Sequence, residues 1–279
     1  MVNDMSFLKK SKKQNKSDNT KNWQLRLGIV LVSVVTLLVV VGLFWTPYEP
    51  TAMSAALKNK PPSLTHPLGT DYMGRDVLSR VMDGAGTTFF IGVATVLIGL
   101  VLGTLLGAFT GYYGGIVDEL LMRLNDTLTS MPSILLALVF VSIIGTGKYN
   151  IIIALGVIFI PSFARVVRSE YLVQKEMDYV RNAKLLGAGN LRIMFVHILP
   201  NTKSILLSTI TIGLNNAILA EAGMSYLSLG VQPPDASLGR MLSEAQGYLL
   251  SSPWMALAPG MMIVLTVLGF SLISENLKN

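Results

Sequence analysis

The sequence contains no cysteine and only two histidines among its 279 residues. The absence of cysteine excludes disulfides, thiolate metal sites and a cysteine nucleophile. His66 and His197 are far apart in the chain, so a zinc site built from protein ligands is not expected. Charged residues are also scarce, at 14% of the chain, whereas a soluble domain carries about a quarter. The composition therefore indicates an integral membrane protein without a metal site.

Long apolar runs dominate what is present. Hydrophobic residues make up 51% of the chain, and the mean hydropathy is +0.56. An apolar helix of about 20 residues crosses a hydrocarbon core about 30 Å thick. We therefore predict an all-α integral membrane protein with about six transmembrane helices. The predicted spans are residues 27–45, 89–109, 120–144, 151–167, 205–220 and 256–273.

The chain divides into three predicted parts. Residues 1–26 form a lysine-rich tail suited to anionic lipid. Residues 27–87 hold the first span and an outer connector with an amphipathic helix at 71–86, in which Asp76 and Arg80 have the spacing of a surface ion pair. Residues 88–279 form the transmembrane core. Regularly spaced glycines in its first span favour close packing between helices in lipid.

The distribution of basic residues predicts the orientation. Most of the 22 lysines and arginines lie in the tail and in residues 165–203. Cytoplasmic loops carry an excess of lysine and arginine. Six spans with a cytoplasmic N-terminus place the tail, the loop at 176–201 and the C-terminus on the same side. We therefore expect a multi-pass protein of a bacterial cytoplasmic membrane with both termini in the cytoplasm.

The sequence offers no catalytic motif. The nearest approach to a nucleotide-binding loop, at 145–148, has Ser142 in place of the first glycine and Tyr149 in place of the magnesium-binding hydroxyl. Any nucleotide must therefore be hydrolysed by another polypeptide. Arg123 and Asp126, three residues apart, are interpreted as a structural intramembrane ion pair rather than a proton relay. No residue is assigned a catalytic, cofactor-binding or metal-binding role.

The polar segment at 176–201 interrupts two apolar blocks. The helical spacing of its apolar residues predicts a short amphipathic helix, a glycine bend at Gly187 and a second short helix that Pro200 ends. Such a segment is either a docking element or an amphipathic helix lying on lipid. The residues that form the predicted apolar face of the first helix are Tyr179, Val180, Ala183 and Leu186.

This segment resembles the cytoplasmic coupling loop of ABC importer permeases, whose pattern begins with Glu-Ala-Ala and a glycine and ends with Leu-Pro. Ala183, Gly187, Leu199 and Pro200 match that pattern at the right spacing. The chain departs from it at Arg181, Asn182 and His197. The resemblance implies that the loop docks on an ATPase subunit. The coupling residues it implies are Tyr179, Val180, Ala183, Leu186, Gly187, Ala188, Leu199 and Pro200.

Further segments, which begin at His66, Met122 and Ile218, are similar to the permeases of dipeptide, oligopeptide and nickel importers, specifically the second of two paired permease subunits. The resemblance covers the chain from near Leu68 to Leu277. It implies a permease subunit, not an enzyme, that moves peptides or nickel or metal chelates. The implied partners are a paralogous permease, two cytoplasmic ATPase subunits that bind the ATP, an extracytoplasmic solute-binding protein and membrane lipid, without nucleic acid.

Two other functions stay open at this point. An ion-coupled secondary transporter would carry ionisable residues near the middle of its spans, and few are found there. A membrane scaffold that transports nothing would need no ionisable residues within its spans. The outer segment at 221–254 is either a lid with part of the binding-protein surface or a re-entrant element. The sequence does not choose between a peptide and a metal chelate as cargo.

Overall fold

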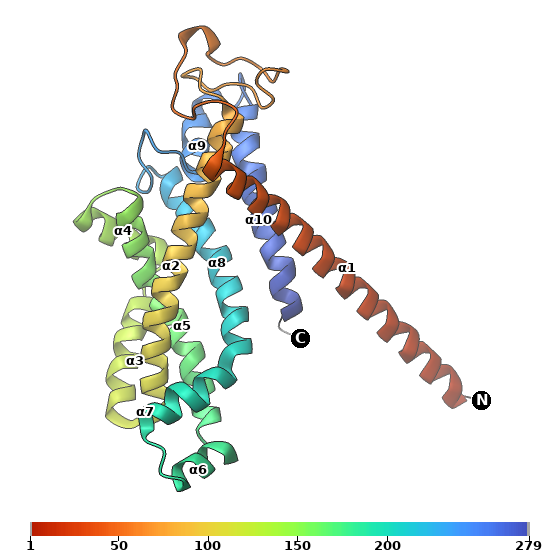
Figure 1. Cartoon of the computed structure of the whole chain (residues 1–279), viewed down its shortest axis with the longest axis vertical. Helices are drawn as coiled ribbons and strands as arrows, with labels where there is room; N and C mark the ends of the chain where they lie inside the picture. Colours follow the sequence, from red (N-terminus) through yellow and green to blue (C-terminus); the bar gives the residue numbers. More distant parts are fainter. Residues whose placement is uncertain (1, 278–279) are drawn as a thin grey trace.

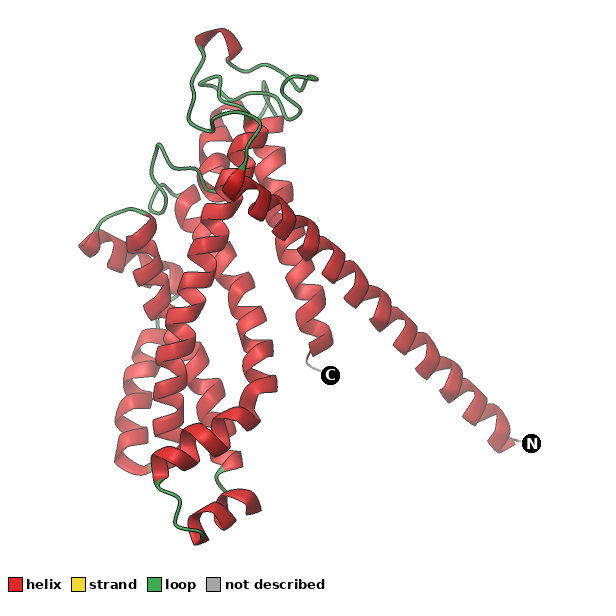
Figure 2. Ribbon diagram, in the orientation of Figure 1, coloured by secondary structure: helices red, strands yellow, loops and turns green. Residues whose placement is uncertain are grey.

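The computed structural model describes the backbone of residues 2–277 and the side chains of residues 23–276. This part of the chain is helical and contains no strand (Figures 1 and 2). The side chains of the predicted tail up to residue 22 lie outside the described residues. The helices are α1 Val2–Phe44, α2 Val77–Tyr113, α3 Gly115–Thr129, α4 Ser133–Ile144, α5 Lys148–Gln174, α6 Asp178–Leu185, α7 Asn190–Arg192, α8 Lys203–Tyr226, α9 Leu238–Ala245 and α10 Trp254–Leu277.

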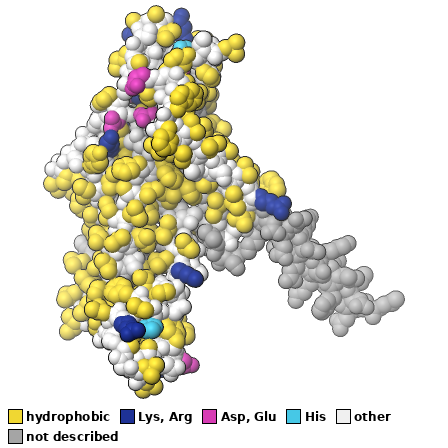
Figure 3. All heavy atoms as spheres, in the orientation of Figure 1, with side chains coloured by type: hydrophobic (Ala, Val, Ile, Leu, Met, Phe, Trp, Pro, Cys, Tyr) yellow, Lys and Arg dark blue, Asp and Glu magenta, His cyan; other side chains and the backbone are white. Residues whose placement is uncertain are grey.

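Within the described part of the chain, five helices are long and apolar enough to cross a membrane, or six if α3 and α4 count together as one bent span. On the face seen in Figure 3, hydrophobic side chains cover the middle of the molecule and charged side chains lie nearer its two ends. This distribution is expected of a protein whose middle lies in lipid. The predicted all-α membrane fold with about six spans is confirmed.

The two ends of the molecule differ. One end, here called the α6 pole, is formed by α6 and α7 (Figure 1). The other, here called the α9 pole, is formed by α9 and by the irregular connector at residues 45–76, between α1 and α2. Both α1 and α10 have one end near the α9 pole and extend from it toward the side of the α6 pole.

The third predicted span, at 120–144, is not continuous. The structure breaks it between α3 and α4, whose axes meet at 91°. Pro132 stands immediately before α4 with extended backbone angles. Proline has no amide hydrogen to donate, and it disfavours the helical conformation at the residue before it. The helix therefore ends at its C-cap residue Ser130, two residues before Pro132, in the middle of the apolar run.

The amphipathic helix predicted at 71–86 is not a separate element. The α2 helix begins at Val77 and continues to Tyr113, and its Asp76 carboxylate accepts a hydrogen bond from the Ser79 amide at the N-terminus. The predicted apolar face, including Val77 and Val81, packs against α9 and α10 in one buried cluster. The prediction of an interfacial helix is therefore wrong, because its apolar face meets protein rather than lipid.

A row of glycines joins α2 to α5. Gly99, Gly103, Gly107 and Gly111 are spaced by four residues, so they lie on one face of α2. A methyl group added at Gly107 would lie 2.5 Å from the Ala164 carbonyl oxygen, and the other three positions are similarly close to α5. The backbones of the two helices thus approach each other more closely than any side chain permits. The predicted packing role of the glycines is confirmed.

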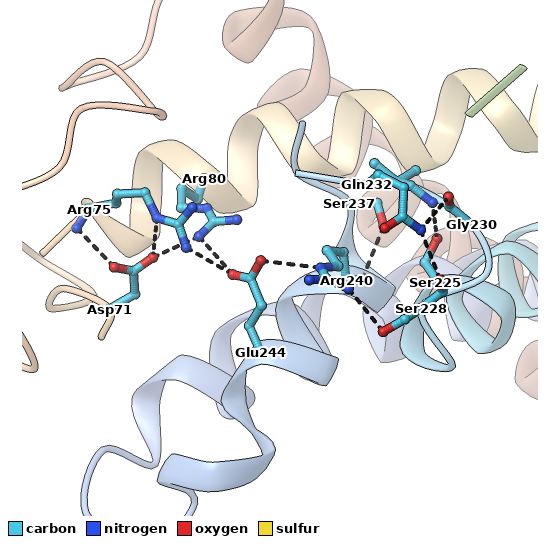
Figure 4. A network of polar contacts seen from close by, with 11 residues as sticks. Asp71, Arg75, Arg80, Ser225, Ser228, Gly230, Gln232, Ser237, Arg240 and Glu244 are labelled. Carbon is cyan, nitrogen blue, oxygen red and sulfur yellow. Dashed lines mark hydrogen bonds and ion pairs between the residues drawn. The ribbon is translucent and has the colours of Figure 1, made fainter. Parts of the chain in front are cut away.

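A buried charge network ties the connector to α9 at the α9 pole (Figure 4). The Arg75 guanidinium donates to the Asp71 carboxylate at 2.6 Å and to Glu244 at 2.9 Å. Arg80 donates to the same two carboxylates at 2.7 and 3.0 Å, and Arg240 reaches Glu244 at 3.3 Å. Because each buried arginine faces two carboxylates, the network holds the connector, α2 and α9 in one arrangement.

The predicted Asp76–Arg80 surface pair does not form. Asp76 instead contacts the His66 ring at 2.9 Å while it caps α2, and Arg80 points into the buried network. The spacing of four residues suggested a local pair. The burial of the connector supplies each side chain with a partner from farther away.

Candidate functional site

The α6 helix ends in a glycine cap. Gly187 has a φ of +80°, which a residue with a side chain rarely adopts. The Gly187 amide donates to the Lys184 carbonyl and the Ala188 amide to the Ala183 carbonyl, both at 3.0 Å. These two bonds form the Schellman arrangement, which satisfies the last carbonyls of a helix. The predicted bend at Gly187 is confirmed, and its physical cause is this cap.

One face of α6 is buried on the transmembrane helices. Val180 is fully buried and Ala183 nearly so. They pack with Tyr171 of α5, with Ala108 of α2 and with Ile193 of the segment after α7. Tyr179 and Ala188 lie at the edge of the same cluster. Leu199 packs against the cluster as well, so the structure brings together five of the predicted coupling residues.

Two polar contacts reinforce this junction. The buried Tyr171 hydroxyl donates to the Met194 carbonyl oxygen at 2.9 Å. The Lys175 ammonium donates to the Gly111 carbonyl oxygen at 3.0 Å, across α5 and α2. A buried hydrogen bond is costly to break when no water replaces it. These contacts anchor the loop to α2 and α5.

Leu186, predicted to lie on the buried face, is 88% exposed. Its neighbour Leu185 is 86% exposed, and together they form the tip of α6. Leu186 is the C-cap residue of α6, directly before the positive-φ glycine, and it is not part of the buried cluster. Two adjacent exposed leucines at the end of a well-anchored helix form an apolar surface suited to a docking contact. The sequence signal for Leu185 was its position beside Leu186 at the cap.

The second half of the loop continues directly into the next span. After α7, the chain forms a π-helical segment, Ile193–Ile198, and then a 3₁₀ turn, Leu199–Thr202, before α8. Leu199 is partly buried, and Pro200 is exposed in the first turn of that 3₁₀ segment. The second predicted helix thus ends at Ile198, and Pro200 stands in the first turn of the next segment, as predicted. The change of helix type lets the helical path pass a residue that has no amide hydrogen.

Arg123 and Asp126 do not pair with each other. The Arg123 guanidinium donates to Glu119 at 2.6 Å, and Asp126 accepts from Arg165 of α5 at 2.8 Å. All four side chains are at least half exposed. The predicted intramembrane pair is therefore wrong. Residues three apart on a helix are neighbours, but each of these carboxylates and guanidiniums meets a better-placed partner.

The loop at 145–148 is a turn between α4 and α5, as its sequence indicates. The Gly147 amide donates to the Gly230 carbonyl oxygen at 3.1 Å, and the Lys148 ammonium donates to the Asp235 carboxylate at 2.8 Å. These contacts tie the turn to the segment between α8 and α9. Lys148 is thus part of a structural ion pair on the α9 side of the molecule.

The glycine cap predicts a difference between two neighbouring glycines. A left-handed residue with a side chain costs about 1–2 kcal/mol, so Gly187→Val should raise hydrogen exchange at the Gly187 and Ala188 amide positions about tenfold. Gly189 has an extended φ of −70° and open space around it, so Gly189→Val should leave exchange unchanged. The Gly187→Asn variant should exchange these amide hydrogens at nearly the parent rate, because asparagine tolerates a positive φ. Equal effects of both valines would contradict the cap.

Comparison with known proteins gives three kinds of match. The family described as the binding-protein-dependent transport system inner membrane component matches residues 99–278. The dipeptide transport system permease protein DppC of Haemophilus influenzae is 37% identical over 91% of this chain and 88% of its own length. The glutathione transport system permease protein GsiD of Escherichia coli is 41% identical over 88% of this chain and 82% of its own.

A solved structure of the MetNI methionine ABC transporter in an inward-facing conformation has the same fold in one of its chains. The TM-score is 0.54 at 21% identity, and the match covers 73% of this chain and 97% of that chain. The loop at 176–201 lies within the residues that the family matches. The sequence relatives and the shared fold therefore point to the same class of membrane protein.

Proposed function

Because this chain belongs to the family of binding-protein-dependent transport system inner membrane components, we propose that it carries short peptides across the cytoplasmic membrane as one half of an import path. The chain is a permease subunit of an ABC importer and not itself an enzyme. The energy for transport comes from ATP that partner ATPase subunits bind and hydrolyse.

The names of the relatives favour peptides as cargo. One is named for dipeptides and another for glutathione, itself a peptide. The resemblance left nickel and metal chelates open beside peptides. Among the residues that the structure describes, no group of three or more histidines, cysteines or acidic residues could hold a metal ion. The preference for peptides rests on the names of the relatives.

The two poles support the proposed partners. The paralogous permease completes the path, two ATPase subunits dock at the α6 pole, and a solute-binding protein docks at the α9 pole. The α6 pole carries Arg181, Lys184 and Arg192 on and beside the loop, which favours a cytoplasmic position. Since α1 and α10 extend toward this side, both termini are cytoplasmic in this arrangement.

One observation carries the proposal: α6 is held firmly at its base and exposes two leucines at its tip. When the ATPase pair closes on ATP, the tip follows the ATPase surface. The base transmits that displacement to α2 and α5, since their backbones are in direct contact along the glycine row. The path thereby opens alternately to the two sides of the membrane.

Uptake in cells that lack only this chain tests the proposal. We expect uptake of a labelled dipeptide to be lost and to return with a plasmid copy. Uptake of nickel, with and without a histidine-like chelator, is measured in the same cells and should stay unchanged. Loss of nickel or chelate uptake alone would identify a metal-acquisition permease instead. Dipeptide uptake that follows an ion gradient without ATP would contradict the ABC mechanism.

A further inference from the structure

A groove of about 570 Å³ opens where the third span is broken. Its walls come from the α3–α4 break, from α5 and from α8. This volume falls within the range of sites that hold small molecules, about 300–1,000 Å³. The break between Thr129 and Ser133 forms part of its wall.

The lining of the groove is uncharged. Among its described residues there is no lysine, arginine, histidine, aspartate or glutamate. Its side-chain hydrogen-bonding groups are the hydroxyls of Thr129, Ser133 and Ser162 and the amide of Asn216, set among apolar residues such as Phe159. Hydroxyl and amide groups both donate and accept hydrogen bonds. They are therefore suited to the amides of a peptide main chain, whatever its side chains.

An ion pair lies one helical turn from this lining and offers one positive and one negative side chain. Arg165 is three residues beyond Ser162 on α5, and Asp126 is three residues before Thr129 on α3, so each shares a face with a residue of the groove. The Arg165 guanidinium donates to the Asp126 carboxylate at 2.8 Å and also to the Thr129 hydroxyl. Because α5 runs toward α6, the pair marks the edge of the groove nearer the α6 pole.

The pair is not a buried structural bridge. The side chains of Arg165 and Asp126 are 50% and 65% exposed, and exposed pairs contribute little to stability, about 0–1 kcal/mol. Both groups are therefore free to exchange partners. A short peptide is a zwitterion, with an ammonium group and a carboxylate, and it offers one group of each sign to this pair.

We propose that the groove is the surface of this chain that contacts the transported peptide. The peptide main chain binds Thr129, Ser133, Ser162 and Asn216, and its terminal charges meet Arg165 and Asp126 as it leaves toward the α6 pole. The inference rests on the proposed function, to which it adds the contact residues. It also explains how one path can accept peptides with different side chains, because the polar groups bind only the main chain and the terminal charges, which all peptides have.

The absence of cysteine from the chain makes a labelling test direct. Single cysteines at Ser162 or Asn216 are introduced into the whole transporter with its binding protein, and the rate of reaction with a water-soluble fluorescent maleimide is measured on this chain. At a dipeptide concentration about ten times its Kd, we expect labelling to slow about tenfold. Ser169→Cys, exposed on α5 outside the groove, is the matched control and should be unaffected.

The charge pair is tested in the Ser162→Cys background. Arg165→Gln and Asp126→Asn should each raise the dipeptide concentration that gives half protection by about tenfold, as expected for one lost charge contact. Arg123→Gln removes an arginine from another exposed ion pair, which lies outside the groove lining, and it should leave protection unchanged. Labelling without peptide shows whether each variant keeps the groove open.

Three results would overturn the inference. Cysteines that react in the isolated chain but never in the transporter would mean that the partner permease covers the groove. Equal protection of Ser169→Cys would mean a general change of conformation, and equal effects of Arg165→Gln and Arg123→Gln would remove the charge pair from the path. Peptide uptake by the parent transporter separates these failures from a failure of the proposed function itself.

Discussion

Replacing Leu185 and Leu186 together by aspartate is expected to abolish ATP-driven peptide uptake while the chain still inserts into the membrane. Both leucines are almost fully exposed, so their loss removes no internal packing. In a complex they are buried by the ATPase, and a buried leucine contributes about 1.5–3 kcal/mol. Aspartates at the same two positions would also have to lose their hydration without a partner. Co-purification of the ATPase subunits with the permease measures the effect directly.

Leu64 and Leu250 provide the matched control. They are at least as exposed as the two leucines of α6 but lie in the connector and beyond α9, on the α9 side. Aspartate at these two positions should leave ATPase co-purification unchanged. If the Leu185 and Leu186 variant kept both its ATPase subunits and its uptake, the tip of α6 would not be the docking contact.

The loop illustrates how far the sequence leads. The spacing of Val180 and Ala183 correctly predicted the buried face of α6, and Gly187 correctly predicted the bend. Leu186 shares that spacing but is exposed. A periodicity argument treats the helix as continuing, whereas the glycine cap redirects the chain at this residue. Adjacent apolar residues at a cap are therefore ambiguous from sequence alone.

The polar side chains were harder to predict because their partners are distant in the chain. Asp126 pairs with Arg165 and Arg80 with Glu244, each through a contact that no local spacing indicates. The break of the third span was also missed, because hydropathy averages over Pro132 and its polar neighbours. The uncharged groove is lined in part by residues at that break. Its residues were consequently not assigned any role from the sequence.

Alanine at both Gly103 and Gly107 is expected to uncouple the α6 pole from the membrane helices. The added methyl groups would lie 2.6 Å from the Phe163 side chain and 2.5 Å from the Ala164 carbonyl oxygen. Both distances are too short for carbon, so α2 and α5 must separate. Overpacking of this kind costs about 1–3 kcal/mol at each site. We expect a lower unfolding temperature of the purified transporter and loss of peptide uptake even in the fraction that stays folded.

Gly223 of α8 separates packing from helix propensity. Apart from the adjacent turns of α8 itself, no described atom lies within 4 Å of a methyl group placed there, and alanine favours a helix over glycine by about 1 kcal/mol. Gly223→Ala should therefore raise the unfolding temperature slightly or leave it unchanged. Alanine at Gly103 and Gly107 brings the same gain in helix propensity. A lower unfolding temperature of that variant therefore measures the cost of crowding against α5. If the Gly103→Ala and Gly107→Ala double variant raised the unfolding temperature as Gly223→Ala does, the close contact between α2 and α5 would be contradicted. The proposed connection from α6 to the transport path would then lose its support.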